Sequence, residues 1–389
     1  MRTPHVPVRI AFAASYTKSI LKFRGSLVSL FLSRGYDVIF MAPFREDDDV
    51  GCKLVALGAE ILPVRIRRKS LNIIDEIVTI ASYARIARSR DIDILVPYTL
   101  KPVIYGGIAL LLNKIRGRSN VVFIPMITGL GFLFSPLAEE SLRFRFLKRT
   151  VIELYRISLL ASAGVIFQNS DDKALFQKLR LIPSDKSTLV VNGSGVNLQE
   201  YPYSHITSRS SFTFVGRLLK SKGILHFLVV ASLMAATHPE IVFNVVGGID
   251  DSCDSVSAQE LERFTRLRNI VFWGHLDNPL PVINKSTCVV LPSIYREGVP
   301  RSLLEALSIG RLLITTNTPG CNLTCHHKKN GYLLKSCDSD SLRRAVLYII
   351  SLTRSELADM SQYSRKLAEK HFDDRLVNNQ ILDFVQLAV

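Results

Sequence analysis

Residues 289–307, VVLPSIYREGVPRSLLEAL, combine an apolar run, a short loop and an amphipathic segment. The run VVLPSI is typical of a strand buried on both faces of a parallel sheet. Gly298 permits a turn, and Pro300 suits the first position of a helix, where its missing N–H is not needed. The stretch therefore predicts a strand–loop–helix unit, with Glu297 in the loop and Glu305 in the helix.

Apolar strands alternate with helices on both sides of this unit. The expected strands cover residues 8–15, 37–43, 93–99, 120–128, 163–170, 187–195, 212–218, 241–248, 269–275, 288–294 and 312–318. Residues 195–211 lose this periodicity and are rich in Ser, Pro and Tyr, as linkers are. The alternation predicts an α/β protein with two facing, doubly wound parallel-sheet domains and a ligand in the cleft between them.

The domain boundaries follow from the same pattern. We expect one parallel-sheet domain over residues 1–200 and a second over residues 201–366. The last helices, 367–389, are long enough to cross back to the first domain. The chain of 389 residues, with 48% hydrophobic and 21% charged residues, is large enough to fill two such cores.

The composition also indicates in which cellular compartment the protein is expected. No stretch approaches the roughly 18–20 apolar residues that span a bilayer, and the apolar run at the N-terminus is too short for a signal peptide. The six cysteines are scattered and do not form a disulfide framework. We therefore expect a cytoplasmic protein.

The segment PGCNLTCHHKKNGYLLKSC, residues 319–337, is a candidate metal site. It contains Cys321, Cys325, His326, His327 and Cys337. The spacing matches no common zinc finger, because paired C-x2-C or H-x3-H units are absent. We expect buried thiols and a solvated turn rather than a metal.

The net charge is +15, and most of the excess lies in residues 1–200. It predicts an anionic partner. Nucleic acid is disfavoured, because no aromatic interleaving, helix-turn-helix or finger pattern is present. The segment 138–163 places basic residues among Leu and Phe in a helical pattern, which suits an anionic membrane surface. A surface helix that packs on its own domain is an equal alternative. The basic residues are Arg143, Arg145, Lys148, Arg149 and Arg156.

The loop FVGRLLKSKGI, residues 214–224, places Arg217 and Lys222 between Gly216 and Gly223. Glycines let a ligand approach the backbone, and an Arg fork with a Lys charge suits a diphosphate. Two solvated cations would give the same pattern.

The two glutamates of residues 289–307 also allow two interpretations. Glu297 and Glu305 could grip an extended polar ligand such as a sugar and a ribose, with the helix amides facing its anion. Alternatively, Glu297 caps the helix and Glu305 pairs with Arg301 four residues before it.

Taken together, these motifs resemble a known family. The order GR…KG (216–223), LPSIYREGVPRSLLEAL, GRLLITTNTPGC and NGYLL resembles the retaining GT-B glycosyltransferases of glycosyltransferase family 4. The resemblance covers residues 206–366, and extends more weakly to the first domain through ITGLGFLFSP, VIFQNSDDKALFQ and VNGSGVNLQEY. It is closest to bacterial enzymes that extend lipid-linked glycans for capsule, O-antigen or glycoprotein assembly.

The resemblance implies roles for individual residues. Arg217 and Lys222 would bind the donor diphosphate, Glu297 and the following amides the transferred sugar, and Glu305 the ribose. The implied donor-binding residues are Gly216, Arg217, Lys222, Glu297, Gly298, Val299, Pro300, Leu304 and Glu305, with Glu297, Arg217 and Lys222 as the catalytic ones. Such enzymes need no metal or other cofactor, so REDDDV (45–50) would be a solvated loop.

The sequence departs from the family at the sugar site in two places. Many relatives have a His where ITGLG here offers Thr128, and Arg-Glu where Asn322 and Leu323 follow PGC. We expect Ser15, Arg24 and Thr128 to contact the acceptor, with Arg24 near its diphosphate.

The implied function is transfer of a hexose or N-acetylhexosamine, with retention, from an NDP-sugar to a polyprenyl-diphosphate-linked saccharide. UDP is the expected nucleotide. The enzyme would lie peripherally at the inner face of the plasma membrane and bind no nucleic acid. An NDP-sugar epimerase on the same fold is one alternative. A non-enzymatic basic nucleic-acid-binding protein is another, but it leaves the glutamates and the Arg–Lys loop unexplained.

Overall fold

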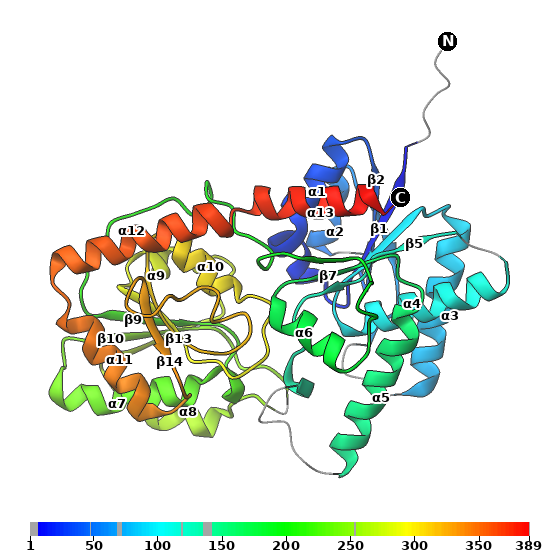
Figure 1. Ribbon diagram of the computed structural model, residues 1–389. Helices are drawn as coiled ribbons and strands as arrows, with labels where there is room; N and C mark the ends of the chain where they lie inside the picture. The colour runs from blue at the N-terminus through cyan, green and yellow to red at the C-terminus, as the bar shows by residue number, and fades with distance from the viewer. Residues whose placement is uncertain are drawn as a thin grey trace. The chain divides into compact units, whose positions relative to one another are not determined.

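The chain separates into two compact units (Figure 1). The computed structural model describes residues 7–46, 48–67, 72–117, 120–134, 142–252 and 254–388. Unit 1 comprises Met1–Leu130, Glu140–Ser194 and Val377–Val389, and unit 2 comprises Gly131–Glu139 and Gly195–Leu376. The change at 194/195 lies close to the expected boundary at 200/201.

Unit 1 contains a parallel sheet with the strand order β3-β2-β1-β4-β5. Its strands are β1 (Arg9–Ala13), β2 (Asp37–Ala42), β3 (Glu60–Pro63), β4 (Ile94–Pro97) and β5 (Val122–Phe123). A second parallel sheet has the order β6-β7-β8, with β6 (Met126–Ile127), β7 (Val165–Phe167) and β8 (Thr188–Val190). Strands β1, β2, β4 and β7 are largely apolar and buried, as expected of parallel strands between helix layers, whereas the edge strands β3 and β8 are more exposed.

The helices of unit 1 connect these strands. They are η1 (Thr17–Ser19), α1 (Ile20–Ser33), α2 (Asp49–Ala56), α3 (Ile73–Ser89), α4 (Leu100–Ile115), α5 (Leu142–Leu159) and α6 (Ser170–Lys178). Phe12 of β1 packs edge-on against Phe31 of α1 and stacks on Phe40 of β2. These contacts fix α1 on one face of the sheet.

The last helix, α13 (Asp374–Leu387), belongs mainly to unit 1. Val377, Ile381 and Val385 are buried in the hydrophobic core of that unit. Asn378 donates a hydrogen bond of 3.0 Å to the Ser26 hydroxyl of α1. The end of the chain therefore stabilises the unit that contains its beginning.

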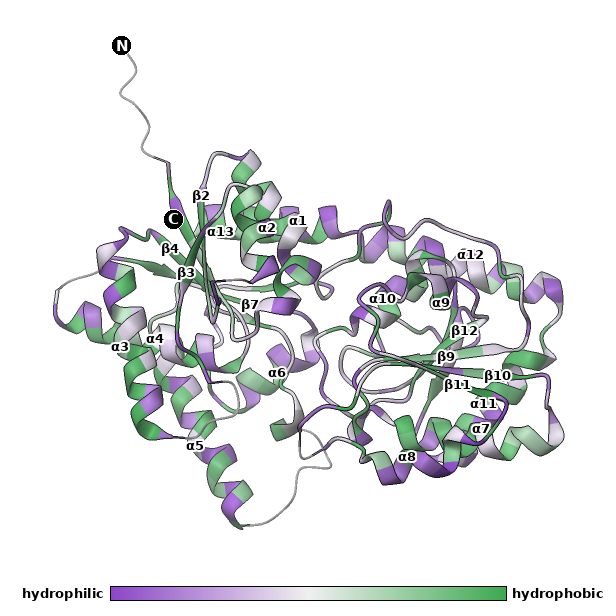
Figure 2. Ribbon diagram, turned by 180° about the vertical axis from the view of Figure 1, so that it is seen from behind, coloured by the Kyte–Doolittle hydropathy of each residue, from purple (hydrophilic) through white to green (hydrophobic). Residues whose placement is uncertain are grey.

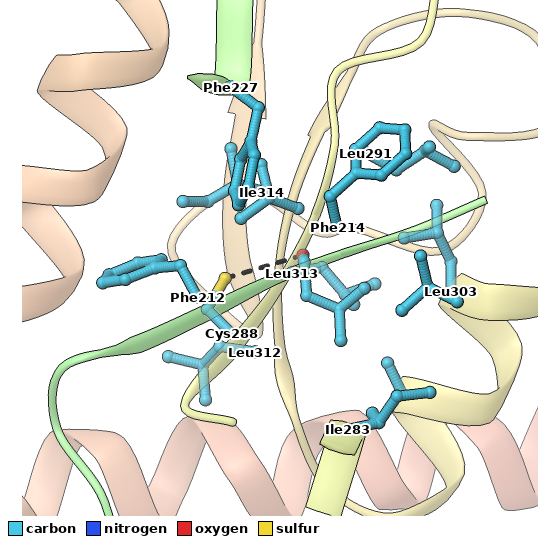
Figure 3. Close-up of a cluster of buried hydrophobic side chains, with 14 of the residues drawn as sticks. Phe212, Phe214, Phe227, Ile283, Cys288, Leu291, Leu303, Leu312, Leu313 and Ile314 are labelled. Atoms are coloured by element: carbon cyan, nitrogen blue, oxygen red, sulfur yellow. Dashed lines mark hydrogen bonds between the residues drawn. The ribbon is translucent and has the colours of Figure 1, made fainter. Parts of the chain in front are cut away.

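Unit 2 contains a six-stranded parallel sheet with the order β11-β10-β9-β12-β13-β14. Its strands are β9 (Ser211–Val215), β10 (Val242–Val246), β11 (Ile270–Gly274), β12 (Cys288–Leu291), β13 (Leu312–Thr316) and β14 (Gly331–Leu334). Figure 2 shows the labelled strands β9–β12 with much of the green of apolar residues. Figure 3 shows Phe212 and Phe214 of β9, Ile314 of β13 and the side chain of Phe227 gathered in the core. Strand order reverses between β9 and β12, which is where open parallel sheets bind ligands.

The remaining elements of unit 2 are helical. They are η2 (Phe132–Phe134), η3 (Lys220–Lys222), α7 (Ile224–Thr237), α8 (Ala258–Thr265), α9 (Leu280–Asn284), α10 (Arg301–Ser308), α11 (Ser339–Ser351) and α12 (Arg354–His371). The predicted α/β class with two Rossmann-like parallel-sheet domains is confirmed. Within the described ranges, no helix has the length and apolar character needed to cross a bilayer.

The basic segment 138–163 forms α5 from Leu142 onward, and its first residues lie outside the described ranges. Val151, Tyr155 and Leu159 are buried against unit 1. Leu142 and Phe146, in contrast, are 80% and 73% exposed. The helix thus packs on its own unit through its second half and leaves apolar side chains in solvent in its first.

Candidate active site

The candidate site of unit 2 lies where strand order reverses. One loop follows β9 and contains Gly216, Arg217 and η3, and the other follows β12 and contains Glu297. Because β9 and β12 are parallel neighbours, both loops emerge at the same edge of the sheet. The position is that expected for a ligand site.

The two loops are joined through backbone contacts. The Ser221 carbonyl accepts hydrogen bonds from the Ile294 N–H at 2.8 Å and from the Ser293 hydroxyl at 3.4 Å. Gly223 has a φ of +76°, and a Cβ there would lie 2.5 Å from the Pro292 carbonyl oxygen. Only glycine therefore lets the loops approach this closely.

Lys222 and Glu297 form an ion pair across the junction. Lys222 Nζ lies 2.8 Å from Glu297 Oε1, and the side chains are 13% and 14% exposed. Pro300 occupies the N-cap position of α10, three residues after Glu297. The fold thus brings together two residues that the sequence predicted for one site. Gly216 adjoins them, since a Cβ on it would lie 3.6 Å from Lys222 Cδ.

Arg217 pairs with a carboxylate that the sequence did not single out. Its Nη1 donates to Asp250 Oδ2 at 2.8 Å, and Asp250 lies in the loop that follows β10. Partial burial lowers the pKa of the guanidinium, but the Asp250 hydrogen bond and nearby Tyr295 and Glu297 outweigh it, so the pKa lies above its ordinary value. Arg217 remains a cation that is 39% exposed. Asp250 could have been recognised from the sequence, because it follows β10, a parallel neighbour of β9, at the edge of the sheet where a site is expected.

A second aspartate fixes the loop that carries both cations. Asp254 accepts hydrogen bonds from the Ser221 N–H at 3.2 Å and from its hydroxyl, and its carbonyl accepts from the Lys220 N–H at 2.8 Å. These three hydrogen bonds to Asp254 thus hold η3 in one conformation. Lys222 is presented from a rigid turn.

Glu305 is held inside unit 2 rather than presented on its surface. It is 1% exposed, and Oε1 accepts hydrogen bonds from the Tyr201 hydroxyl at 3.1 Å and from Arg301 Nε at 3.2 Å. Arg301 also donates to the Gly195 carbonyl at 2.8 Å. Burial and the Glu305 carboxylate together raise the pKa of Tyr201. The pairing of Glu305 with Arg301, one of the two interpretations of the sequence, is present.

Two details of the predicted helix require correction. Pro300 is the N-cap and α10 begins at Arg301, one position later than the prediction, because Pro300 has an extended ψ of 121°. Leu304 is fully buried with Leu303 in the hydrophobic core, so its side chain packs the fold and is not accessible to a ligand. Gly298, Val299 and Pro300 are buried as well, and a ligand could reach them only through the backbone.

The loop after β13 closes on the Glu297 loop. Thr318 Oγ1 donates to the Ser293 carbonyl at 2.9 Å. Gly320 has a φ of +80°, and a Cβ there would lie 2.2 Å from the Gly298 carbonyl oxygen. Cys321 follows it in the core, where burial and the nearby Glu297 raise the pKa of its thiol to about 11.

We expect Gly320→Ala to destabilise the protein by at least about 2 kcal/mol, because an L residue is strained at positive φ and the methyl group overlaps the Gly298 carbonyl. Gly274→Ala is the matched control. Gly274 also has a positive φ, of +66°, but nothing lies within 4 Å of its Cβ position. Denaturant unfolding should show a clearly larger loss for Gly320→Ala. Equal losses of unfolding free energy in the two variants would mean that the Gly298 carbonyl moves away from residue 320 without an energetic cost.

The Cys and His side chains of the candidate metal segment, residues 319–337, are buried or make hydrogen bonds within unit 2. Cys321 and Cys325 are buried, and Cys337 Sγ lies 2.8 Å from the Pro292 carbonyl oxygen. His326 Nδ1 lies 2.8 Å from the Tyr363 hydroxyl, and His327 Nδ1 accepts from the Leu333 N–H at 3.2 Å. Within the residues that the structure describes, no group of three or more His, Cys, Asp or Glu side chains is placed to hold a metal ion.

Two of the three predicted acceptor residues, Ser15 and Thr128, lie in unit 1 after strands. Ser15 follows β1, and its hydroxyl lies 2.9 Å from Thr99 Oγ1. Thr128 is half-buried directly after β6. Thr99, which the sequence did not mark, has a φ of +69° that is unusual for a β-branched residue.

Arg24 requires a correction, because it is not available on the surface for a diphosphate. It is 2% exposed, its guanidinium lies 5.2 Å from the centre of the Tyr98 ring, and Nη2 lies 2.9 Å from Met126 Sδ. The sequence contained a sign of this burial, because Arg24 lies on α1 among the residues of its buried face.

Comparisons with known proteins identify unit 2. A family model described as Glycosyl transferases group 1 matches residues 204–367. A curated N,N'-diacetylbacillosaminyl-diphospho-undecaprenol alpha-1,3-N-acetylgalactosaminyltransferase of Campylobacter jejuni is 21% identical, with 96% of this chain and 100% of that protein covered. A UDP-Gal:alpha-D-GlcNAc-diphosphoundecaprenol alpha-1,3-galactosyltransferase of Escherichia coli is 24% identical over 72% of each chain.

Solved structures give the same fold over nearly the whole chain. The sucrose-phosphate synthase of Thermosynechococcus elongatus superposes with a TM-score of 0.77 at 15% identity, covering 98% of both chains. Anabaena HepE in complex with UDP and glucose superposes with a TM-score of 0.75 at 15% identity, covering 97% of this chain and 99% of that one. Residues 204–367 therefore form a glycosyl transferases group 1 domain, and the chain is a glycosyltransferase with the GT-B fold.

Proposed function

We propose that the protein transfers a hexose or N-acetylhexosamine, with retention, from a UDP-sugar to a saccharide linked to polyprenyl diphosphate. The observation that carries the donor half is the meeting of Arg217, Lys222 and Glu297 at the edge of the unit 2 sheet where strand order reverses. Two fixed cations and a carboxylate at such an edge suit a diphosphate with a sugar attached.

The cations would act on the charge that develops when the sugar leaves. The bond between the sugar and the β-phosphate breaks, and negative charge accumulates on the departing diphosphate. Arg217 and Lys222 are already in place, so they stabilise that charge without reorganisation. Together with the amides at the start of α10, they would supply this stabilisation without a metal. The Asp250 contact uses Arg217 Nη1, and a guanidinium has five N–H donors in all.

The two glutamates would hold the neutral parts of the donor. Glu297, which is 14% exposed, would accept hydrogen bonds from the transferred sugar's hydroxyls. Glu305 would hold the ribose. Its carboxylate is oriented by Tyr201 and Arg301, and since it is 1% exposed, a ribose contact requires the covering residues to shift.

The acceptor half rests on the relatives. Both curated relatives described above are named as transferases to saccharides on diphosphoundecaprenol, one of them with a UDP-Gal donor, and both as alpha-transferases. An α-linkage formed from an α-linked UDP-sugar is retention. Ser15 and Thr128, after strands of unit 1, would contact the acceptor, and α5 with its exposed Leu142 and Phe146 would hold the protein at the inner face of the plasma membrane.

A panel of nucleotides and nucleotide sugars tests this proposal. We expect UDP and one UDP-sugar to raise the melting temperature in a concentration-dependent way, because ligands that bind only the folded state stabilise it. Nucleoside diphosphates with other bases should have less effect. A panel without any stabilising nucleotide would contradict the donor assignment.

Turnover of the stabilising sugar nucleotide then separates transfer from epimerisation. We expect UDP release only when a polyprenyl-diphosphate-linked saccharide is added. Conversion of the donor into its epimer without an acceptor would favour the epimerase instead.

A further inference from the structure

The first two turns of α3 expose a cluster of large apolar side chains. Ile73, Ile74, Ile77 and Val78 are 73%, 71%, 60% and 47% exposed. Single exposed apolar residues are common, but a contiguous group of four is typical of a binding surface. We call these four residues the α3 patch.

The acidic residues of the same turns do not face solvent beside the patch. The Asp75 side chain is 19% exposed and pairs with Arg67 at 3.0 Å and Arg65 at 3.7 Å. The Glu76 side chain is also 19% exposed and pairs with Lys101 at 2.6 Å. These are the only acidic residues of α3, a helix that is described in full. Both carboxylates are thus neutralised.

Exposed arginines lie at both ends of the patch. Before α3, the side chains of Arg65 and Arg67 are 64% and 57% exposed. Further along the helix, Arg85 and Arg88 are exposed. Arg85 lies 11 positions after Ile74 in the sequence, which at 3.6 residues per turn places it on the same side of the helix.

We propose that the α3 patch and its flanking arginines insert into the interface of an anionic lipid surface. Apolar side chains would enter the acyl boundary while the arginines contact phosphate groups. A second copy of the chain fits less well, because an isologous contact would place these arginines against one another. The inference rests on the membrane association in the proposed function and names a second surface for it.

The position of α3 in unit 1 agrees with this role. α4 packs against both α3 and α5, so the three helices lie side by side (Figure 1). Helices α3 and α5 each return between parallel strands, so both begin at the carboxyl edges of the strands. The α3 patch and the exposed Leu142 and Phe146 of α5 are both in the first turns of their helices. One lipid surface could contact both.

Co-sedimentation of the full-length protein with vesicles tests the proposal. Vesicles of equal parts phosphatidylcholine and phosphatidylglycerol are compared with phosphatidylcholine alone. We expect Ile74→Ser with Ile77→Ser to weaken binding to the anionic vesicles at least about tenfold, because two inserted isoleucines are lost.

Ile115→Ser is the matched control. Ile115 is 81% exposed at the end of α4, a helix that runs parallel to α3, so it lies at the opposite edge. Its substitution should leave binding unchanged.

A second variant tests the charges. Arg85→Gln with Arg88→Gln should weaken binding to the anionic vesicles severalfold. It should also make that binding less dependent on salt concentration. Each substitution is on an exposed side chain, and unchanged melting temperatures would verify folding. Wild-type binding by the isoleucine variant, or equal binding of the wild type to both vesicle types, would overturn the proposal. UDP-dependent stabilisation reports the donor site separately, so failure here would leave that assignment intact.

Discussion

Replacing Arg217 by alanine is expected to lower kcat by about 10²–10³-fold, the usual loss when a pre-positioned donor to developing negative charge is removed. The residue lies in the loop after β9, and its single contact with Asp250 leaves a cation that is 39% exposed. Because that charge would act mainly on the departing diphosphate, the affinity for the intact sugar nucleotide should fall by less than kcat does. Steady-state kinetics with the donor found in the nucleotide panel would measure both parameters.

Two further variants make this result specific. Arg217→Lys keeps the charge but loses the planar fork, so it should recover only part of the activity. Arg266→Ala is the matched control. Arg266 follows α8 in the same unit and also pairs with a carboxylate, that of Glu262 at 3.5 Å, but its side chain is 82% exposed. It should retain wild-type kinetics. An Arg217→Ala enzyme that keeps both its fold and its turnover would contradict the donor-site assignment.

The alternating pattern of the sequence predicted the sheets well for a physical reason. A parallel strand is buried on both faces, so it reads as an unbroken apolar run, and residues 289–307 contain such a run followed by a turn and a helix start. The chemistry then had to lie directly after the strands, and Lys222 and Glu297 do meet there. Both residues were predicted from loops that are far apart in the chain.

The failures concern residues whose role depends on the environment of the side chain. Leu304 and Arg24 lie on the inward faces of α10 and α1, and both side chains are buried. Asp250 follows β10, as a site residue of a parallel sheet should, but its contact with Arg217 has no marker in the sequence. Thr99 was missed because a backbone torsion of +69° has no sequence marker in a threonine. Tertiary contacts decide each of these cases.

Replacing Lys222 and Glu297 separately is expected to give opposite patterns of binding, since the two residues are assigned to different parts of the donor. Lys222→Met removes a charge that is 13% exposed, so the affinity for UDP itself should fall about tenfold or more. Glu297→Gln keeps the shape of the side chain but removes the negative charge beside Lys222. The affinity for UDP should then be unchanged or slightly higher, while kcat with the sugar nucleotide falls by about tenfold to a hundredfold. Calorimetric titration with UDP and steady-state kinetics would give the two quantities.

The double variant shows whether the pair acts as one unit. Lys222 Nζ and Glu297 Oε1 are 2.8 Å apart and largely shielded from solvent, so either substitution removes an ion pair in a poorly solvated position. The combined effect of Lys222→Met and Glu297→Gln on stability should therefore be smaller than the sum of the single effects. Lys220→Met is a suitable control, because Lys220 lies in the same turn and pairs with Glu260 at 2.8 Å, but its side chain is 44% exposed. If Glu297→Gln weakened UDP binding as strongly as Lys222→Met did, Glu297 would contribute mainly to positioning the lysine, and its assignment to the sugar would be wrong.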